Sequence, residues 1–172
     1  MLKLLGSLGI LFGCVGLGID RIGEEKGRIS HLQELIRIIR RIQSEVSYGK
    51  HTLPEICLIL AETCAAPYRE GFRAIYDKAG QEAGSCLEQI WRQELTQCMQ
   101  NVQLQEEEKE VLRDLPQNLG IQEEKYQAES IGQSVDLLIR KCREAEDAYA
   151  NKSRMIFSLS ILSGVFLTIL FL

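Results

Sequence analysis

The stretch EVSYGKHTLPE, residues 45–55, separates two apolar patterns, and its chemistry decides between a functional loop and a corner of the fold. A phosphate-binding P-loop needs Gly-x-x-x-x-Gly-Lys-Ser/Thr, and here both the first glycine and the hydroxyl after Lys50 are missing. A catalytic His51 would need a carboxylate or nucleophile beside it, which the sequence does not fix. His31 lies about five helical turns earlier. The stretch therefore predicts neither a phosphate site nor a catalytic site.

The same stretch contains the residues that end one helix and begin another. Gly49 suits a left-handed C-terminal cap. Thr52 is placed to cap the next helix, and Pro54 lies in its first turn, where a missing N–H is tolerated. Glu55 stands three residues after Thr52, as a capping box requires. We therefore predict a corner between two helices.

Apolar residues at three-and-four spacing predict helices, and no strand, through the middle of the chain, so the fold class is all-α. The predicted helices are six: residues 24–48, 53–65, a third ending at 80, 85–98, 105–116, and a last one that carries residues 131–149. Trp91 lies at core spacing in the fourth helix, and we predict it as a core residue rather than a stacking platform. The last helix has the most regular stripe: Ile131, Val135, Leu138, Cys142, Ala145 and Tyr149. No proline or glycine separates that stripe from the C-terminal apolar run, so we expect one continuous helix.

The two ends of the chain are apolar, whereas the middle is charged. Residues 155–172 contain no charge and would form a helix of about 27 Å, close to the thickness of a bilayer core. We predict a transmembrane helix there. Residues 4–19 form a shorter run of roughly 24 Å, which suits either a second span or a secretory signal peptide. The predicted domains are a first span at 1–19, a soluble domain at 20–154 and a second span at 155–172.

Charge and cysteine usage favour a two-pass membrane protein with its domain in the cytoplasm. Arg21, Lys26 and Arg28 follow the first run, and Lys152 and Arg154 precede the second, whereas only Lys3 lies on the far side. The domain also has an odd set of cysteines without a CxxC pair, which we expect to be reduced, buried small residues: Cys57, Cys64, Cys86, Cys98 and Cys142. A cleaved export signal stays the alternative.

Small residues repeat at a four-residue interval within each apolar run. Gly9 and Gly13 form one pair, and Ser160 and Gly164 form another. Such pairs let helix backbones approach closely, so they suit packing of the two spans on each other or on further copies of the chain. Simple tolerance of glycine explains them equally well, and homo-oligomerisation stays open.

Two charge clusters are candidate partner-binding surfaces. Arg37, Arg40 and Arg41 lie on the first long helix, and the acidic cluster consists of Glu106, Glu107, Glu108 and Glu110. Each cluster is more commonly a solvated face, and the two would also suit pairing with each other. The net charge of −4 and the absence of a long basic stripe disfavour nucleic-acid binding. Two histidines and scattered cysteines give no zinc spacing, and no cofactor is expected.

The order of these features resembles that of a known family. A short glycine-rich span precedes RIGEEKGRISHLQELIRIIRRIQSEVSYGKHTLPE (residues 21–55), followed by CLEQIWRQEL (86–95), LPQNLG (115–120) and a heptad helix that enters a terminal span. This order resembles the stage III sporulation protein AB family, a relative of the type II secretion F domain. Leu119 and Gly120 form part of the match, but Gln122 stands where the family leads us to expect an aspartate.

The resemblance implies a cytoplasmic six-helix bundle of the type II secretion F-domain kind, flanked by two spans. It implies a non-enzymatic membrane platform in a secretion-like channel between mother cell and forespore. The implied partners are a cytosolic hexameric ATPase, stage III sporulation protein AA, and other channel components. A membrane-anchored helical adaptor that recruits a soluble partner unrelated to transport is the competing function. An enzyme is disfavoured because neither apolar run, residues 4–19 or 155–172, contains an Asp, Glu, Lys, Arg or His residue for a buried site.

Overall fold

The computed structural model describes residues 2–48, 51–81, 86–119 and 124–171, and it is all-helical over those residues. Side chains are described there except for residues 2–22, 24, 48, 81, 118, 119, 124–129 and most of 157–171. The described residues form seven helices in the order α1 (Leu2–Tyr48), α2 (Leu53–Thr63), α3 (Tyr68–Gln81), α4 (Leu87–Cys98), α5 (Glu106–Arg113), α6 (Leu115–Leu119) and α7 (Glu124–Phe171). The all-α prediction is confirmed.

The chain divides into two units. The helical body consists of Ser30–Cys142, and the helical stem consists of Met1–Ile29 and Arg143–Leu172. The soluble domain at residues 20–154 stays a prediction, and α1 and α7 continue as helices across both of its boundaries. The continuous last helix is confirmed. The continuity of α1 was not predicted, because several glycines stand between the apolar run and the first amphipathic face.

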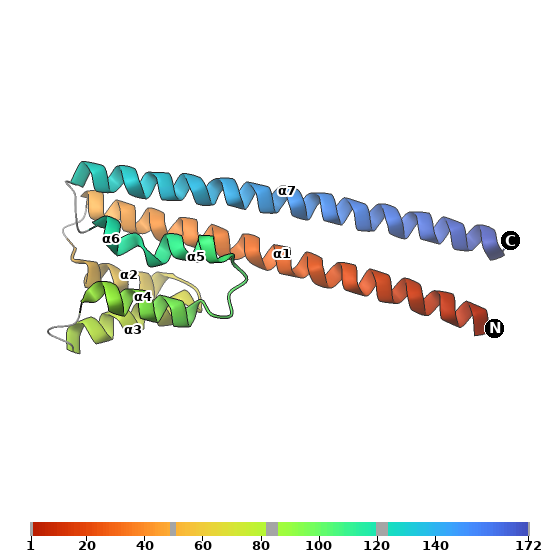
Figure 1. Ribbon diagram of the computed structural model, residues 1–172, viewed down its shortest axis with the longest axis horizontal. Helices are drawn as coiled ribbons and strands as arrows, with labels where there is room; N and C mark the ends of the chain where they lie inside the picture. The colour runs from red at the N-terminus through yellow and green to blue at the C-terminus, as the bar shows by residue number, and fades with distance from the viewer. Residues whose placement is uncertain (1, 49–50, 82–85, 120–123, 172) are drawn as a thin grey trace. The chain divides into compact units, whose positions relative to one another are not determined.

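The stem contains two antiparallel helical segments, the N-terminal part of α1 and the C-terminal part of α7 (Figure 1). Lys152 of α7 donates a hydrogen bond to the carboxylate of Glu25 on α1, and the two side chains form an ion pair. Among residues whose side chains are described, no helix has both the length and the apolar character needed to cross a membrane. The small-residue pairs Gly9/Gly13 and Ser160/Gly164 lie outside the described side chains, as do most of both apolar runs, so the spans and their packing stay predictions.

Within the body, α2, α3 and α4 pack in succession, and α4 in turn contacts α5 and α6 (Figure 1). Apolar side chains from every helix of the body whose side chains are described fill the core, and most of the predicted apolar faces point inward. Of the heptad stripe on α7, all but Tyr149 are buried. The core therefore follows the three-and-four spacing of the sequence.

Trp91 joins three helices of the body. Its side chain is fully buried, and its ring lies edge-on to Phe72 of α3, with the ring centroids 5.6 Å apart. Its indole N–H donates a hydrogen bond of 2.9 Å to the backbone carbonyl of Leu112 in α5. The prediction of Trp91 as a core residue is confirmed.

The predicted corner is built as a capping box, as far as the structure describes it. Thr52 precedes α2 in extended conformation, and the carboxylate of Glu55 accepts its N–H at 2.7 Å and its hydroxyl at 3.0 Å. Pro54 lies in the first turn of α2. The carboxylate's hydrogen bonds to Thr52 lower the pKa of Glu55. Gly49 lies outside the described residues.

The predicted fifth helix is two helices. Asp114 ends α5, its N–H bonded to the carbonyl of Glu110 at 2.9 Å, and α6 starts at the next residue. Pro116 explains the break, because it has no N–H for the carbonyl of Leu112 and its ring would clash with that carbonyl in a continuous helix, whereas it is tolerated in the first turn of α6. Gly120, in the predicted LG motif, and the side chain of Leu119 lie outside the described part.

The cysteine prediction is partly wrong. Cys57, Cys64 and Cys142 are buried thiols that form no disulfide with a described residue, and burial raises the pKa of the Cys57 thiol to about 12. Cys98 is half-buried, and Cys86, which directly precedes α4, is exposed. Its position before the first turn of α4, outside the apolar face, accounts for the difference.

Truncating Trp91 tests its role as a link between helices. We expect Trp91→Ala to lower the free energy of unfolding by about 3–5 kcal/mol, because it leaves a cavity and an unpaired carbonyl at Leu112. Thermal unfolding of the detergent-solubilised chain, followed by circular dichroism, measures the change. Gln93→Ala, an exposed substitution on the same helix, is the control and should shift the unfolding free energy by less than about 0.5 kcal/mol. Equal effects of the two substitutions would contradict this role for Trp91.

Gly71 lets α3 and α4 approach closely. A Cβ atom at Gly71 would lie 2.7 Å from Sγ of Cys98, whereas a Cβ at Gly80 of the same helix would meet nothing within 4 Å. We expect Gly71→Ala to destabilise the body by roughly 1–3 kcal/mol through overpacking, and Gly80→Ala to stabilise it by up to about 1 kcal/mol. A double-mutant cycle with Cys98→Ala separates the contact from helix propensity. If Cys98→Ala does not relieve the Gly71→Ala penalty, the clash is not its cause.

Candidate functional site

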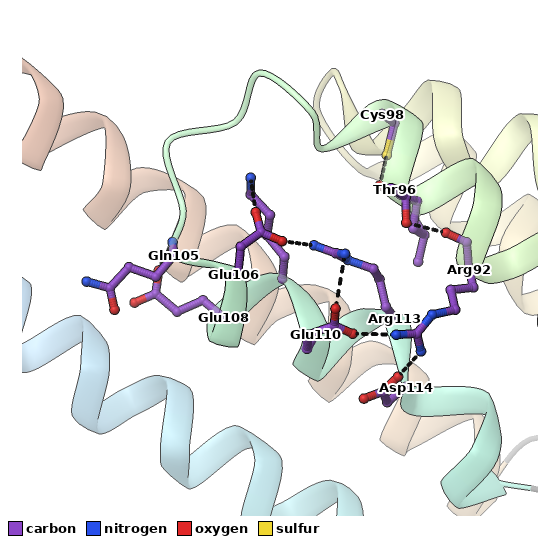
Figure 2. Close-up of polar contacts among 11 residues, drawn as sticks. Arg92, Thr96, Cys98, Gln105, Glu106, Glu108, Glu110, Arg113 and Asp114 are labelled. Atoms are coloured by element: carbon purple, nitrogen blue, oxygen red, sulfur yellow. Dashed lines mark hydrogen bonds and ion pairs between the residues drawn. The ribbon is translucent and has the colours of Figure 1, made fainter.

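A network of alternating charges connects α4 with α5 (Figure 2). Arg92 of α4 donates hydrogen bonds to Glu110 at 3.0 Å and to Asp114. Arg113 donates to the other oxygen of Glu110 at 3.1 Å and to Glu106 at 2.7 Å. The chain of pairs therefore connects the surfaces of α4 and α5.

The side chains of the predicted acidic cluster differ in burial. Glu108 is 1% exposed, and its carboxylate accepts the N–H of Gln105 at 2.8 Å in a capping box at the start of α5. Glu106 and Glu107 have side chains that are 70% and 80% exposed. Glu108 is therefore the weakest candidate of the cluster for partner binding, since capping turns its side chain inward.

The rest of the acidic cluster is neutralised within the body. Lys109 bonds Glu106 at 3.0 Å, and Lys141 of α7 bonds Glu107 at 3.4 Å. Hydrogen bonds from Arg113 and Lys109 lower the pKa of the Glu106 carboxyl. Since each exposed carboxylate already faces a cation, the cluster offers a partner little uncompensated negative charge.

The basic residues of α1 are differently placed. Arg37 pairs with Glu34 and Arg41 pairs with Glu45 at 3.0 Å, both along the same helix. The side chains of Arg37 and Arg41 are nevertheless 72% and 52% exposed. Arg40 is exposed and makes no ion pair with any described residue. The two predicted clusters do not pair with each other in the described contacts.

His51 has a partner that the sequence did not reveal. Its Nδ1 lies 3.1 Å from the carboxylate of Glu45, which also binds Arg41. The pairing spans the corner between α1 and α2, so no periodicity on either helix could indicate it. No nucleophile accompanies this pair among the described contacts, and the arrangement fixes the corner.

An open cleft of about 540 Å³ lies between α3 and α4. The cleft is lined by His31 of α1 and by Pro67, Glu70, Gly71, Ala74, Glu94, Gln97, Cys98, Asn101 and Val102. Tyr68 is fully buried beside His31, with its hydroxyl 3.4 Å from Nδ1. Burial lowers the pKa of His31, although the nearby Glu34 opposes this shift.

Sequence reasoning missed this cleft, because its lining comes from three helices and the turn after α4. The one local signal is the small residue pair Gly71 and Ala74 on one side of α3. Within the described part of the chain, no three histidine, cysteine or acidic side chains are grouped so as to hold a metal ion.

Comparison with known protein families identifies relatives of this chain. The sequence profile described as "Stage III sporulation protein AB (spore_III_AB)" matches residues 3–172. The chain belongs to the stage III sporulation protein AB family. Stage III sporulation protein AB of Bacillus subtilis (strain 168) is 28% identical over 170 residues, which cover 99% of both chains. A solved structure of a stage III sporulation protein AB shares the fold, with a TM-score of 0.64 and 24% identity over 72% of this chain and 97% of that one.

The charge network predicts a pH-dependent effect of Glu106→Gln. Because the folded-state pKa of Glu106 is lowered, its ionised form contributes stability that is present above the ordinary carboxyl range near about 4 and is lost as pH falls through the lowered value. We therefore expect Glu106→Gln to lower the melting temperature at pH 7 and to have a diminishing effect as the pH falls below that range. Glu62→Gln, an exposed change on α2, is the matched control. A melting-temperature difference that stays constant down to the acid limit would refute the pairing.

Proposed function

We propose that the chain is a non-enzymatic membrane platform of a sporulation-specific, secretion-like channel between mother cell and forespore. The observation that carries this proposal is the family match over nearly the whole chain. The body adds a helical surface with paired and unpaired charges, which suits protein docking. The type II secretion F-domain character, with its six-helix bundle, is part of the same proposal.

The proposal includes two membrane spans, at residues 1–19 and 155–172, and a body in the mother-cell cytoplasm. The absence of any charge from residues 155–172 supports the second span. The basic residues Arg21, Lys26, Arg28, Lys152 and Arg154 beside the two runs support the orientation. A cleaved N-terminal signal would instead place the body outside.

The partner in this proposal is a cytosolic hexameric ATPase, expected to be stage III sporulation protein AA. The docking face is the basic stripe of α1, which consists of Arg37, Arg40 and Arg41. Arg37, Arg40 and Arg41 extend into solvent, and Arg40 has no counter-ion among the described residues. The acidic cluster is a weaker candidate since its carboxylates are already compensated. Arg40 therefore offers an acidic surface on the ATPase a positive charge without a counter-ion in the described part of the chain, and Arg37 and Arg41 add exposed charge that is paired only along their own helix.

A membrane-anchored adaptor that recruits a soluble protein unrelated to transport is the second candidate. It would use the same exposed stripe and the same anchors, and it would need no ATPase. The partner that the body binds in the cell distinguishes the two.

Affinity capture of the full-length, detergent-solubilised chain from sporulating cells, with mass spectrometry of the bound proteins, tests the proposal. Recovery of the ATPase with the full-length chain, and its loss on deletion of the body, is expected. Recovery of envelope or extracellular proteins alone would invert the topology and overturn the platform.

Charge reversal of the basic stripe tests the docking face. We expect Arg37→Glu, Arg40→Glu and Arg41→Glu together to reduce ATPase capture by at least about tenfold, since electrostatic complementarity becomes like-charge repulsion. Arg73→Glu on α3 is the matched control, because Arg73 is also exposed and pairs only along its own helix. Capture that survives reversal of the stripe but is lost with Glu106→Lys and Glu107→Lys would move docking to the acidic cluster.

A further inference from the structure

The cleft between α3 and α4 has the dimensions of a binding site. Its volume of about 540 Å³ lies within the range of about 300–1,000 Å³ typical of ligand pockets. The cleft is part of the helical body, and every lining residue belongs to Ser30–Cys142. Its lining is a mixture of apolar groups, amides and carboxylates.

The cleft has negative electrostatic character. Glu94 is buried and paired with Lys78 at 2.6 Å, whereas Glu70 is exposed and makes no ion pair or hydrogen bond with a described residue. Burial and the charges of Glu94 and Glu70 together raise the pKa of Cys98 to about 12, so both carboxylates act on the floor of the cleft. No lysine or arginine is among the lining residues of the described part.

The lining residues indicate which chemical group the cleft would bind. Gly71 lies against the Cys98 side chain, and Ala74 and Val102 complete an apolar floor. Burial of His31 lowers its pKa, which favours the uncharged ring and so limits repulsion toward a cation. A positive charge on an apolar stem therefore fits better than a bare metal ion or an anion.

Two side-chain amides in the lining favour a peptide segment over a free amine as the ligand of the cleft. Gln97 and Asn101 are exposed lining residues, and each side chain carries both a donor and an acceptor. A peptide backbone offers the complementary acceptor and donor, whereas a free polyamine offers donors only.

We propose that the cleft binds a lysine or arginine side chain presented by an exposed peptide segment of a protein partner, with the cation at Glu70 and its stem over Gly71 and Ala74. This assignment rests on the proposed function only for the identity of the partner. The binding chemistry belongs to the cleft itself and can be measured without a partner protein.

The test uses the full-length chain in detergent micelles and two blocked tripeptides. One is acetyl-Ala-Arg-Ala-amide, and the other has neutral citrulline in place of arginine, which has nearly the same shape. Saturation-transfer NMR titration should give about tenfold tighter binding of the arginine peptide, the value of a charge-assisted hydrogen bond. Glu70→Gln should abolish that preference, and Glu62→Gln should leave it intact.

Three outcomes would overturn the proposal. Equal binding of both peptides to the native chain would exclude a cation site, and a preference that persists in Glu70→Gln would place it elsewhere. Binding of spermidine without binding of the arginine peptide would identify a free amine as the occupant. None of these results depends on the ATPase, so failure of the cleft and failure of the platform proposal are separable.

Discussion

The hydrogen bond from Trp91 to the carbonyl of Leu112 is the interaction on which the arrangement of the body depends. It connects α4 to α5 inside the core, while the aromatic contact with Phe72 connects α4 to α3. An indole N–H buried without a partner would cost about 1–3 kcal/mol, so the contact selects one register between the two helices. That register brings Arg92 within reach of Glu110 and Asp114, and the surface network follows from the core contact.

The paired charges at α4 and α5 explain why a run of acidic residues need not be a binding surface. In the sequence, Glu106, Glu107, Glu108 and Glu110 form a dense acidic segment next to a helix start. In the fold, Glu108 caps α5 and the others face Arg113, Lys109, Lys141 and Arg92. The side chains of Lys109 and Arg113 are only 10% exposed, whereas the carboxylates they pair with face solvent. These pairs remove the free charge that would steer a partner.

Periodicity predicted the features that depend on local chemistry. The capping box at Thr52 and Glu55, the core position of Trp91 and the buried face of α7 each arise from residue types at short spacing, so the sequence contains them directly. The continuity of α1 was missed because glycine has a low helix propensity in isolation, whereas neighbouring turns hold Gly23 within the helix. The division of α5 from α6 was missed because Pro116 was included in a continuous apolar pattern. The cleft and the pairing of His51 with Glu45 depend on segments that meet only after folding.

The two candidate docking surfaces of the body have charges of opposite sign. The stripe on α1 presents arginines, and the cleft between α3 and α4 presents the Glu70 carboxylate. A partner with charge of one sign would be attracted to one surface and repelled by the other. Its favourable orientations of approach would therefore be restricted. A partner with an acidic patch and a basic segment at the matching separation would satisfy both surfaces at once. Opposite charges on one body thus select the orientation of a partner as well as its identity, because each wrong approach brings like charges together.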